Sequence, residues 1–211
     1  MFRKALLTTA APIALFALSS VARADTITLT GVNGTGVTAT VSNYSLVGNT
    51  FTFTIANTAV APGTTGVITN IGFDLPGNRT GFTLVSSSNP NYSVVGATKI
   101  TSGAQTITSS TNFDLTLFNG NGNPTFGGGS VNGGIAGGTT ATFSISGNFS
   151  GLTADQIAHS VFARFQNVNP GGSDVATPTG STVPEPMTMI LFGTGLAGLA
   201  ARARRRRNSK A

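Results

Sequence analysis

Few residue types in this 211-residue chain could support catalysis. His159 is the only histidine and cysteine is absent, which excludes metal sites built from several His or Cys ligands. A Ser-His-Asp arrangement would combine His159 with Asp155 or Asp174, but no Gly-x-Ser-x-Gly elbow is present. Paired carboxylates for glycoside hydrolysis are also poorly provided, because no glutamate precedes Glu185. The sequence therefore predicts a protein that is not an enzyme and needs no cofactor or metal.

A carbohydrate-binding module or adhesin would need an exposed aromatic platform. Tryptophan is absent, so the candidates are Tyr44, Tyr92 and some of the phenylalanines. This is the main alternative to a purely structural role, and exposed aromatic rings would favour it.

Two further patterns imitate binding motifs. Gly193, Gly195 and Gly198 match the dinucleotide fingerprint by letter, but they lie in an apolar run without a βαβ context. Threonine alternates within 26–30, 38–40 and 50–54, as it does on ice-binding faces. The spacing between these units is irregular, which favours solvent-facing positions of ordinary strands.

The segment 183–211 has three parts in succession. Val183, Pro184, Glu185 and Pro186 precede the apolar run 187–201, and a basic tail follows at 202–211 with Arg202, Arg204, Arg205, Arg206, Arg207 and Lys210. As a helix the apolar run would be about 22 Å long, against a hydrocarbon core of about 30 Å. Arginines resist entry into hydrocarbon and stay on the cytoplasmic side, so we expect a membrane helix stopped by Arg202 to Arg207.

This arrangement resembles the PEP-CTERM sorting signal of Gram-negative bacteria, with 184–186 matching the tripeptide itself. The resemblance implies recognition by exosortase, a membrane protease, cleavage near the motif, and delivery to the cell envelope or the extracellular polysaccharide matrix. The same signal is also labelled an ice-binding protein C-terminal domain, which is no evidence that the protein binds ice. An ordinary C-terminal membrane anchor is the alternative.

The segment 1–24 is typical of a secretory signal peptide. Arg3 and Lys4 form a positive start, an apolar stretch follows at 5–18, and Ala22 and Ala24 complete an Ala-x-Ala site. We expect cleavage after Ala24 and export through the inner membrane.

The charge of the chain is concentrated in these two targeting segments. The sequence pI is about 10.9, yet 25–182 contains three basic and five acidic residues, a net charge of −2. A nucleic-acid partner is therefore not expected. The length of this middle part suits one domain.

Short alternating segments separated by Gly, Pro and Asn predict strand after strand. We expect strands at 26–30, 37–41, 51–55, 67–73, 82–85, 92–95, 105–108, 113–118, 140–145 and 161–168. Such spacing predicts an all-β fold, an antiparallel β-sandwich of the Ig-like or jelly-roll type.

Three segments interrupt this pattern. Thr153 and Gln156 have capping-box spacing and predict one short helix within 152–159. The glycine-rich stretch 119–138 predicts a loop, and 175–182 a linker. The expected domains are thus a signal peptide at 1–24, a β-sandwich at 25–174, the linker, and the sorting signal at 183–211.

Taken together, the sequence predicts a secreted structural or binding protein of a Gram-negative envelope or matrix. The expected partners are an exosortase-type protease, the inner membrane during transit, and extracellular polysaccharide.

Overall fold

The computed structural model describes residues 26–99, 112–120 and 130–179 of the chain. Ten strands and one helix follow one another in these ranges: β1 (Ile27–Gly31), β2 (Thr38–Val47), β3 (Thr50–Asn57), β4 (Thr65–Phe73), β5 (Thr83–Ser87), β6 (Tyr92–Lys99), β7 (Asn112–Asn119), β8 (Thr140–Ser146), α1 (Ala154–Ala158), β9 (Val161–Asn169) and β10 (Gly172–Thr179).

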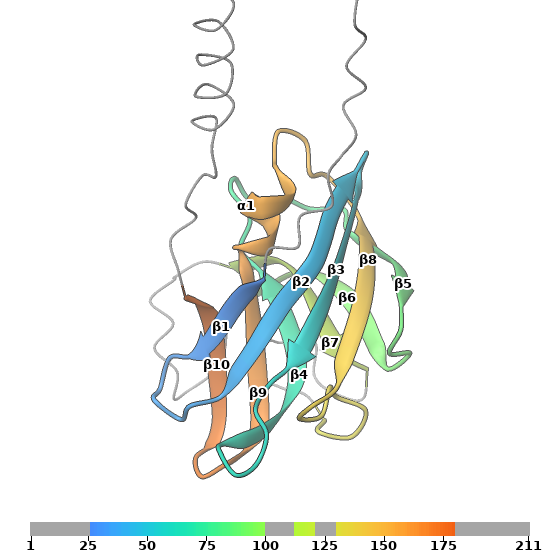
Figure 1. Ribbon diagram of the computed structural model, residues 1–211. Coiled ribbons are helices and arrows are strands. Elements are labelled where there is room, and N and C mark those ends of the chain that lie inside the picture. Colours follow the sequence, from blue (N-terminus) through green and yellow to red (C-terminus); the bar gives the residue numbers. More distant parts are fainter. Residues whose placement is uncertain (1–25, 100–111, 121–129, 180–211) are drawn as a thin grey trace, which may run out of the picture.

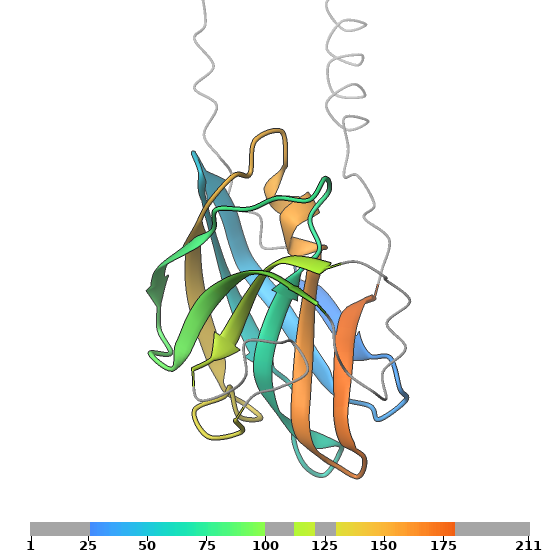
Figure 2. The same cartoon turned by 180° about the vertical axis from the view of Figure 1, so that it is seen from behind.

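All ten strands belong to one antiparallel sheet, in the order β5-β8-β3-β2-β1-β10-β9-β4-β7-β6. The sheet curls until its two halves face each other, which gives a nearly closed cylinder (Figures 1 and 2). The expected all-β antiparallel class is confirmed, but two separate sheets of an Ig-like or jelly-roll sandwich are not formed. Both arrangements bury alternate residues of every strand, so the sequence pattern alone does not separate them.

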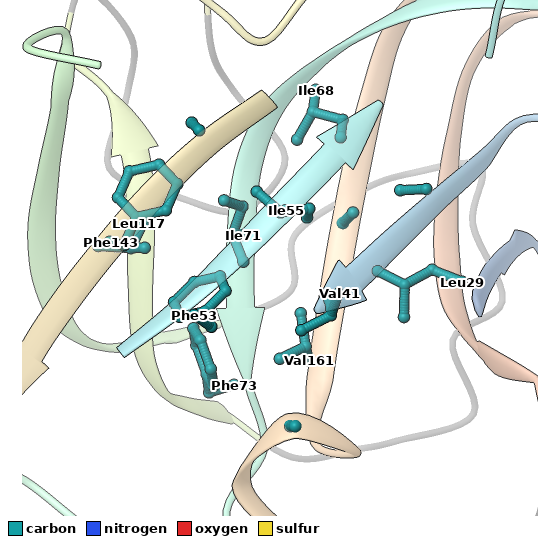
Figure 3. Packing of buried hydrophobic residues seen from close by; sticks show 14 of the residues in the cluster. Leu29, Val41, Phe53, Ile55, Ile68, Ile71, Phe73, Leu117, Phe143 and Val161 are labelled. Carbon is teal, nitrogen blue, oxygen red and sulfur yellow. The ribbon is translucent and has the colours of Figure 1, made fainter. Parts of the chain in front are cut away.

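The interior is filled by the inward-facing residues of the strands. In β3, Phe51, Phe53 and Ile55 are fully buried while the threonines between them face outward. The ring of Phe53 contacts those of Phe73 and Phe143 at centroid distances of 5.4 and 5.5 Å. Figure 3 shows these rings meeting aliphatic side chains from the opposite side of the curled sheet. Period-two alternation has therefore produced one continuous core.

Nine of the ten expected strands coincide with β1 to β9, and the tenth, at 105–108, lies outside the described residues. The expected linker at 175–182 is wrong as far as residue 179. Strand β10 occupies 172–179 and is hydrogen-bonded to β1 on one side and β9 on the other. Residues 172–179 are mostly small or polar, so their sequence did not indicate a strand. Strand β10 nevertheless lies in the middle of the sheet.

The short helix is confirmed as α1. Thr153 is its N-cap and forms the expected capping box with Gln156, each side chain accepting from the other residue's backbone N–H. Within the described ranges, no helix has the length and apolar character needed to cross a membrane. The membrane helix expected at 187–201 lies outside those ranges.

The described end of the glycine-rich stretch, from 130 onward, is attached to the sheet without forming a named strand. Ile135 is buried and exchanges two backbone hydrogen bonds with Ile68. The side-chain amide of Asn57 donates to the Ile135 carbonyl, and that of Asn119 donates to the carbonyls of Ser130 and Asn132. Buried asparagines thus supply hydrogen bonds that a regular ladder would otherwise provide.

Candidate functional site

His159 lies at the C-terminal end of α1. Its Nδ1 lies 2.9 Å from the backbone carbonyl oxygen of Asp155, which can only accept, so the imidazole caps the end of α1. The carboxylate of Asp155 accepts a hydrogen bond of 2.8 Å from the Tyr44 hydroxyl. These contacts are structural, and they match a helix terminus rather than a nucleophile-activating pair.

Asp174 lies in β10 and is separated from His159. It pairs with Phe165 in the middle of β9, six positions along the chain from the histidine. Its buried carboxylate accepts hydrogen bonds from the backbone N–H and side-chain amide of Asn33 and from the Thr35 hydroxyl. Hydrogen bonds to Asp174 therefore hold the β1–β2 loop against β10.

An open hollow of about 320 Å³ lies near the β3–β4 loop. None of its lining residues can titrate; they are Ala59, Val60, Ala61, Thr65, Gly66, Val67, Gly137 and Asn167. Among the described residues, no three His, Asp or Glu side chains are grouped so as to hold a metal ion. The residues that line the hollow could contact a ligand through apolar side chains and backbone polar groups, but none of them could act as a general acid or base.

Both tyrosines proposed for an aromatic platform are buried. Tyr44 is 4% exposed and Tyr92 is 3% exposed. Tyr92 donates a hydrogen bond of 2.6 Å to the Ile68 carbonyl, and its ring packs edge-on against Phe143 at 5.2 Å. These rings contribute to the core and cannot stack on a sugar at the surface.

The buried phenol of Tyr92 makes the fold sensitive to alkali. Burial raises the pKa of Tyr92 above its ordinary value of about 10. The unfolded chain releases this proton first, so the stability contributed by the neutral phenol is complete below pH 10 and is lost as the pH rises further. We expect Tyr92→Phe to be about 1 kcal/mol less stable than the wild type at pH 8, because the bond to Ile68 is lost.

The difference in unfolding free energy between the wild type and Tyr92→Phe should shrink above about pH 10, because only the wild type must keep a buried phenol protonated there. Urea unfolding of both proteins between about pH 8 and pH 11 measures it. A constant difference across this range would contradict the role assigned to Tyr92.

The threonine arrays lie on the outside of the sheet, as expected for solvent-facing positions. Strand register aligns hydroxyl residues across β2, β3 and β8, with Ser42 opposite Thr54 and Thr54 opposite Thr142. The hydroxyls of Thr54 and Thr142 are 2.9 Å apart, as are those of Thr52 and Ser144. This hydroxyl face, formed by the outward Ser and Thr residues of β1, β2, β3 and β8, is the front of the molecule in Figure 1.

The two ends of the described domain leave it side by side. Thr28, in the first strand, pairs with Thr179, the last residue of β10, and the Thr179 hydroxyl donates to the Thr28 carbonyl. The sites predicted for processing precede β1 or follow β10 in the sequence and lie outside the described residues. They are Ala22 and Ala24 before β1, and Val183, Pro184, Glu185, Pro186, Arg202, Arg204, Arg205, Arg206 and Arg207 after β10.

Sequence reasoning also missed Arg164, which lies in β9 and is only 6% exposed. An arginine at an outward position of an alternating strand normally faces solvent, so no sequence signal indicated its burial.

Comparison with known proteins found a match in one region of the chain. The family model for the PEP-CTERM protein-sorting motif matches residues 182–206. Neither the curated proteins nor the solved structures contain a match to the chain. The resemblance noted in the sequence is therefore confirmed: three residues after β10, the chain carries a PEP-CTERM sorting motif, which implies export, processing by an exosortase and sorting to the cell surface.

Proposed function

We propose that this protein is a non-enzymatic structural or binding component of a Gram-negative cell envelope or of the extracellular polysaccharide matrix. A signal peptide ending at Ala24 takes it through the inner membrane, and the PEP-CTERM motif delivers it to the surface after cleavage. The matched motif at 182–206 is the observation that carries this proposal.

The geometry of the chain ends supports such a role. Both targeting segments adjoin strands that are paired with each other, so both can be removed without opening the sheet. Glu185 follows Thr179 by six residues, which span at most about 21 Å when extended. The protease must therefore work close to the folded domain, and little extra chain remains on the product.

The surface chemistry agrees with a hydrated, uncharged environment. The hydroxyl face has Ser and Thr where many soluble proteins have Lys and Glu, and its hydroxyls bond to one another across the strands. A face of this kind interacts with water and sugar hydroxyls without attracting ions.

A carbohydrate-binding module or adhesin is the alternative function. Its expected aromatic platform is not provided by Tyr44 and Tyr92, because both are buried. Such a module would have to bind through hydroxyl, amide or charged groups instead.

Glu185→Ala should block processing, because the substitution removes the charge at the centre of the sorting tripeptide. In the native host we expect the full-size precursor to accumulate in the inner membrane and the surface form to disappear. Ser181→Ala, four positions earlier, is the matched control and should be processed normally. Immunoblots of fractionated cells measure both forms.

Normal surface delivery of Glu185→Ala would contradict sorting through this motif. It would instead favour a plain membrane anchor, for which a single change outside the apolar run is harmless.

A further inference from the structure

The open hollow of about 320 Å³ lies at the end of the cylinder away from α1. Its lining residues come from the β3–β4 loop, the start of β4, the loop before β8 and the last part of β9. In Figures 1 and 2 the β1–β2, β3–β4 and β9–β10 connections all lie at this end. Strand β1 begins and β10 finishes at strand ends remote from these connections, so the two targeting segments adjoin strand ends remote from the hollow.

Asn167 lines the hollow from a β-bulge in β9. The pairing of β4 with β9 shifts register between Thr65 and Val67, so Thr65 pairs with Asn169 and Val67 pairs with Gln166. Asn167 lies in the unpaired stretch and has a φ of 52°, in the left-handed region that asparagine adopts more readily than most residues. It is exposed, and a bulge of this kind turns a side chain out of the regular ladder.

Two polar side chains of the lining make no hydrogen bond within the described part of the chain. They are the hydroxyl of Thr65 and the amide of Asn167. The amide supplies N–H donors and a carbonyl acceptor, and the hydroxyl can both donate and accept. Thr65 is half-buried and Asn167 is exposed, so both groups are accessible to a ligand.

The rest of the lining is mainly apolar, and glycine sets its shape. Val60 is 46% exposed and Val67 is half-buried. A Cβ at Gly137 would lie 2.5 Å from the Ala59 carbonyl oxygen, so glycine allows the loop before β8 to approach the β3–β4 loop this closely. The hollow therefore combines aliphatic surface with a hydroxyl and an amide, and its volume is at the lower end of the roughly 300–1,000 Å³ typical of ligand sites.

The hollow offers no charge to a ligand, because none of its lining residues is charged. Asp174 belongs to a strand that begins at this end, but its carboxylate is fully buried and accepts hydrogen bonds from Asn33, Thr35 and Val175. The half-buried charged side chains of the described residues lie around α1 instead; they are Asp74, Arg79 and Asp155. An ionic ligand would find no counter-charge in the hollow.

From these observations we infer that the hollow binds one sugar residue of a neutral polysaccharide. A pyranose ring presents C–H groups on its faces and hydroxyls at its edge, which match the valine side chains and the polar groups of Thr65 and Asn167. An uncharged lining cannot compensate the desolvation of a uronate. An apolar peptide side chain would leave the hydroxyl and the amide without partners in the complex. The inference rests on the proposed function and names its binding site and ligand class.

Calorimetric titration of the full chain tests this site, in a polyoxyethylene detergent that contains no sugar. The neutral probes are cellotetraose and maltotetraose, an extended and a coiled oligosaccharide. Tetragalacturonate is the anionic counterpart, and a blocked peptide of alternating alanine and valine is the apolar one. We expect one neutral probe to bind at least about tenfold tighter than the anionic and apolar probes, with an affinity that does not change with salt.

Asn167→Gly removes the amide from the hollow without straining the backbone, because glycine readily adopts a positive φ. It should weaken binding of the neutral oligosaccharide at least about tenfold. Asn43→Gly is the matched control. Asn43 is also exposed, has a φ of 50° and lies at a register shift, but it belongs to β2 and does not line the hollow. Its replacement should leave binding unchanged.

Thermal unfolding separates a loss of binding from a loss of folding. Saturating oligosaccharide should raise the Tm of the wild type and of Asn43→Gly, and should raise that of Asn167→Gly less. Thr65→Val, which removes the hydroxyl at nearly constant volume, should also weaken binding and provides a second test if Asn167→Gly is poorly stable.

Three results would each overturn the inference. They are no binding of either neutral probe by the wild type, unchanged binding by both Asn167→Gly and Thr65→Val, and tighter binding of the anionic or the apolar probe. None of these results bears on surface delivery, which the Glu185→Ala experiment tests separately.

Discussion

Asp174→Ala is expected to lower the free energy of unfolding by about 3–5 kcal/mol, a large share of the roughly 5–15 kcal/mol of a typical domain. The change removes the fully buried carboxylate that accepts from Asn33 and Thr35, and it leaves the buried backbone N–H of Val175, which lies 2.7 Å from Oδ1, without this acceptor. It also releases the β1–β2 loop from β10. Urea unfolding measures the loss.

Asp174→Asn should fall between the wild type and Asp174→Ala. Its amide oxygen can still accept from Asn33 and Val175, and the Thr35 hydroxyl can turn from donor to acceptor. Asp155→Ala is the matched control. Asp155 is only half-buried and its carboxylate accepts from the Tyr44 hydroxyl, so a loss of about 1 kcal/mol is expected. Equal losses for Asp174→Ala and Asp155→Ala would contradict the larger stabilising role assigned to the buried carboxylate of Asp174.

Phe53→Ala is expected to cost about 3–5 kcal/mol, because it opens a cavity at the centre of the cylinder. The Phe53 ring contacts Phe51, Phe73 and Phe143, all fully buried. Figure 3 shows Phe53 with Phe73 and Phe143. These contacts join neighbouring strands and opposite sides of the curled sheet, so relaxation can fill little of the space.

Val47→Ala provides the surface control for the cavity prediction. Val47 is 68% exposed at the end of β2, and its truncation should change stability by less than about 0.5 kcal/mol. Thermal or urea unfolding of Phe53→Ala and Val47→Ala measures the two changes in stability. A loss below about 1 kcal/mol for Phe53→Ala would mean that the interior is not packed as the structure has it.

Local patterns predicted the strands well where side chains alternate clearly. Phe51, Phe53 and Ile55 alternate with threonines, and this period-two pattern requires a strand with one buried face. The capping box of Thr153 and Gln156 was equally predictable, because its geometry involves only four consecutive residues.

Features that depend on distant residues were not predictable from the sequence. In β10, Asp174 and Pro178 are typical of loops, and only the partners on β1 and β9 hold them in a strand. The closure of one sheet into a cylinder is likewise decided by strand order and curvature, which alternation does not encode.

The features of the candidate sites likewise divide into local ones, which the sequence predicted, and ones that depend on distant residues, which it did not. The sorting motif is a local sequence feature, and a family model confirms it. The pairing of Thr28 with Thr179, which brings both ends of the domain together, joins residues 151 positions apart. The burial of Arg164 and of both tyrosines also depends on tertiary packing, so no local pattern indicated it, and Tyr44 and Tyr92 were candidates for an exposed platform that the fold does not provide.

Intact mass of the protein recovered from the envelope and medium of its native host tests the central claim most directly. The account predicts a species that begins at Asp25 and ends close to Pro184, which has lost both targeting segments and keeps β1 paired with β10. A surface species that still contains 187–211 would contradict processing through the sorting motif and would make the protein a membrane-anchored one.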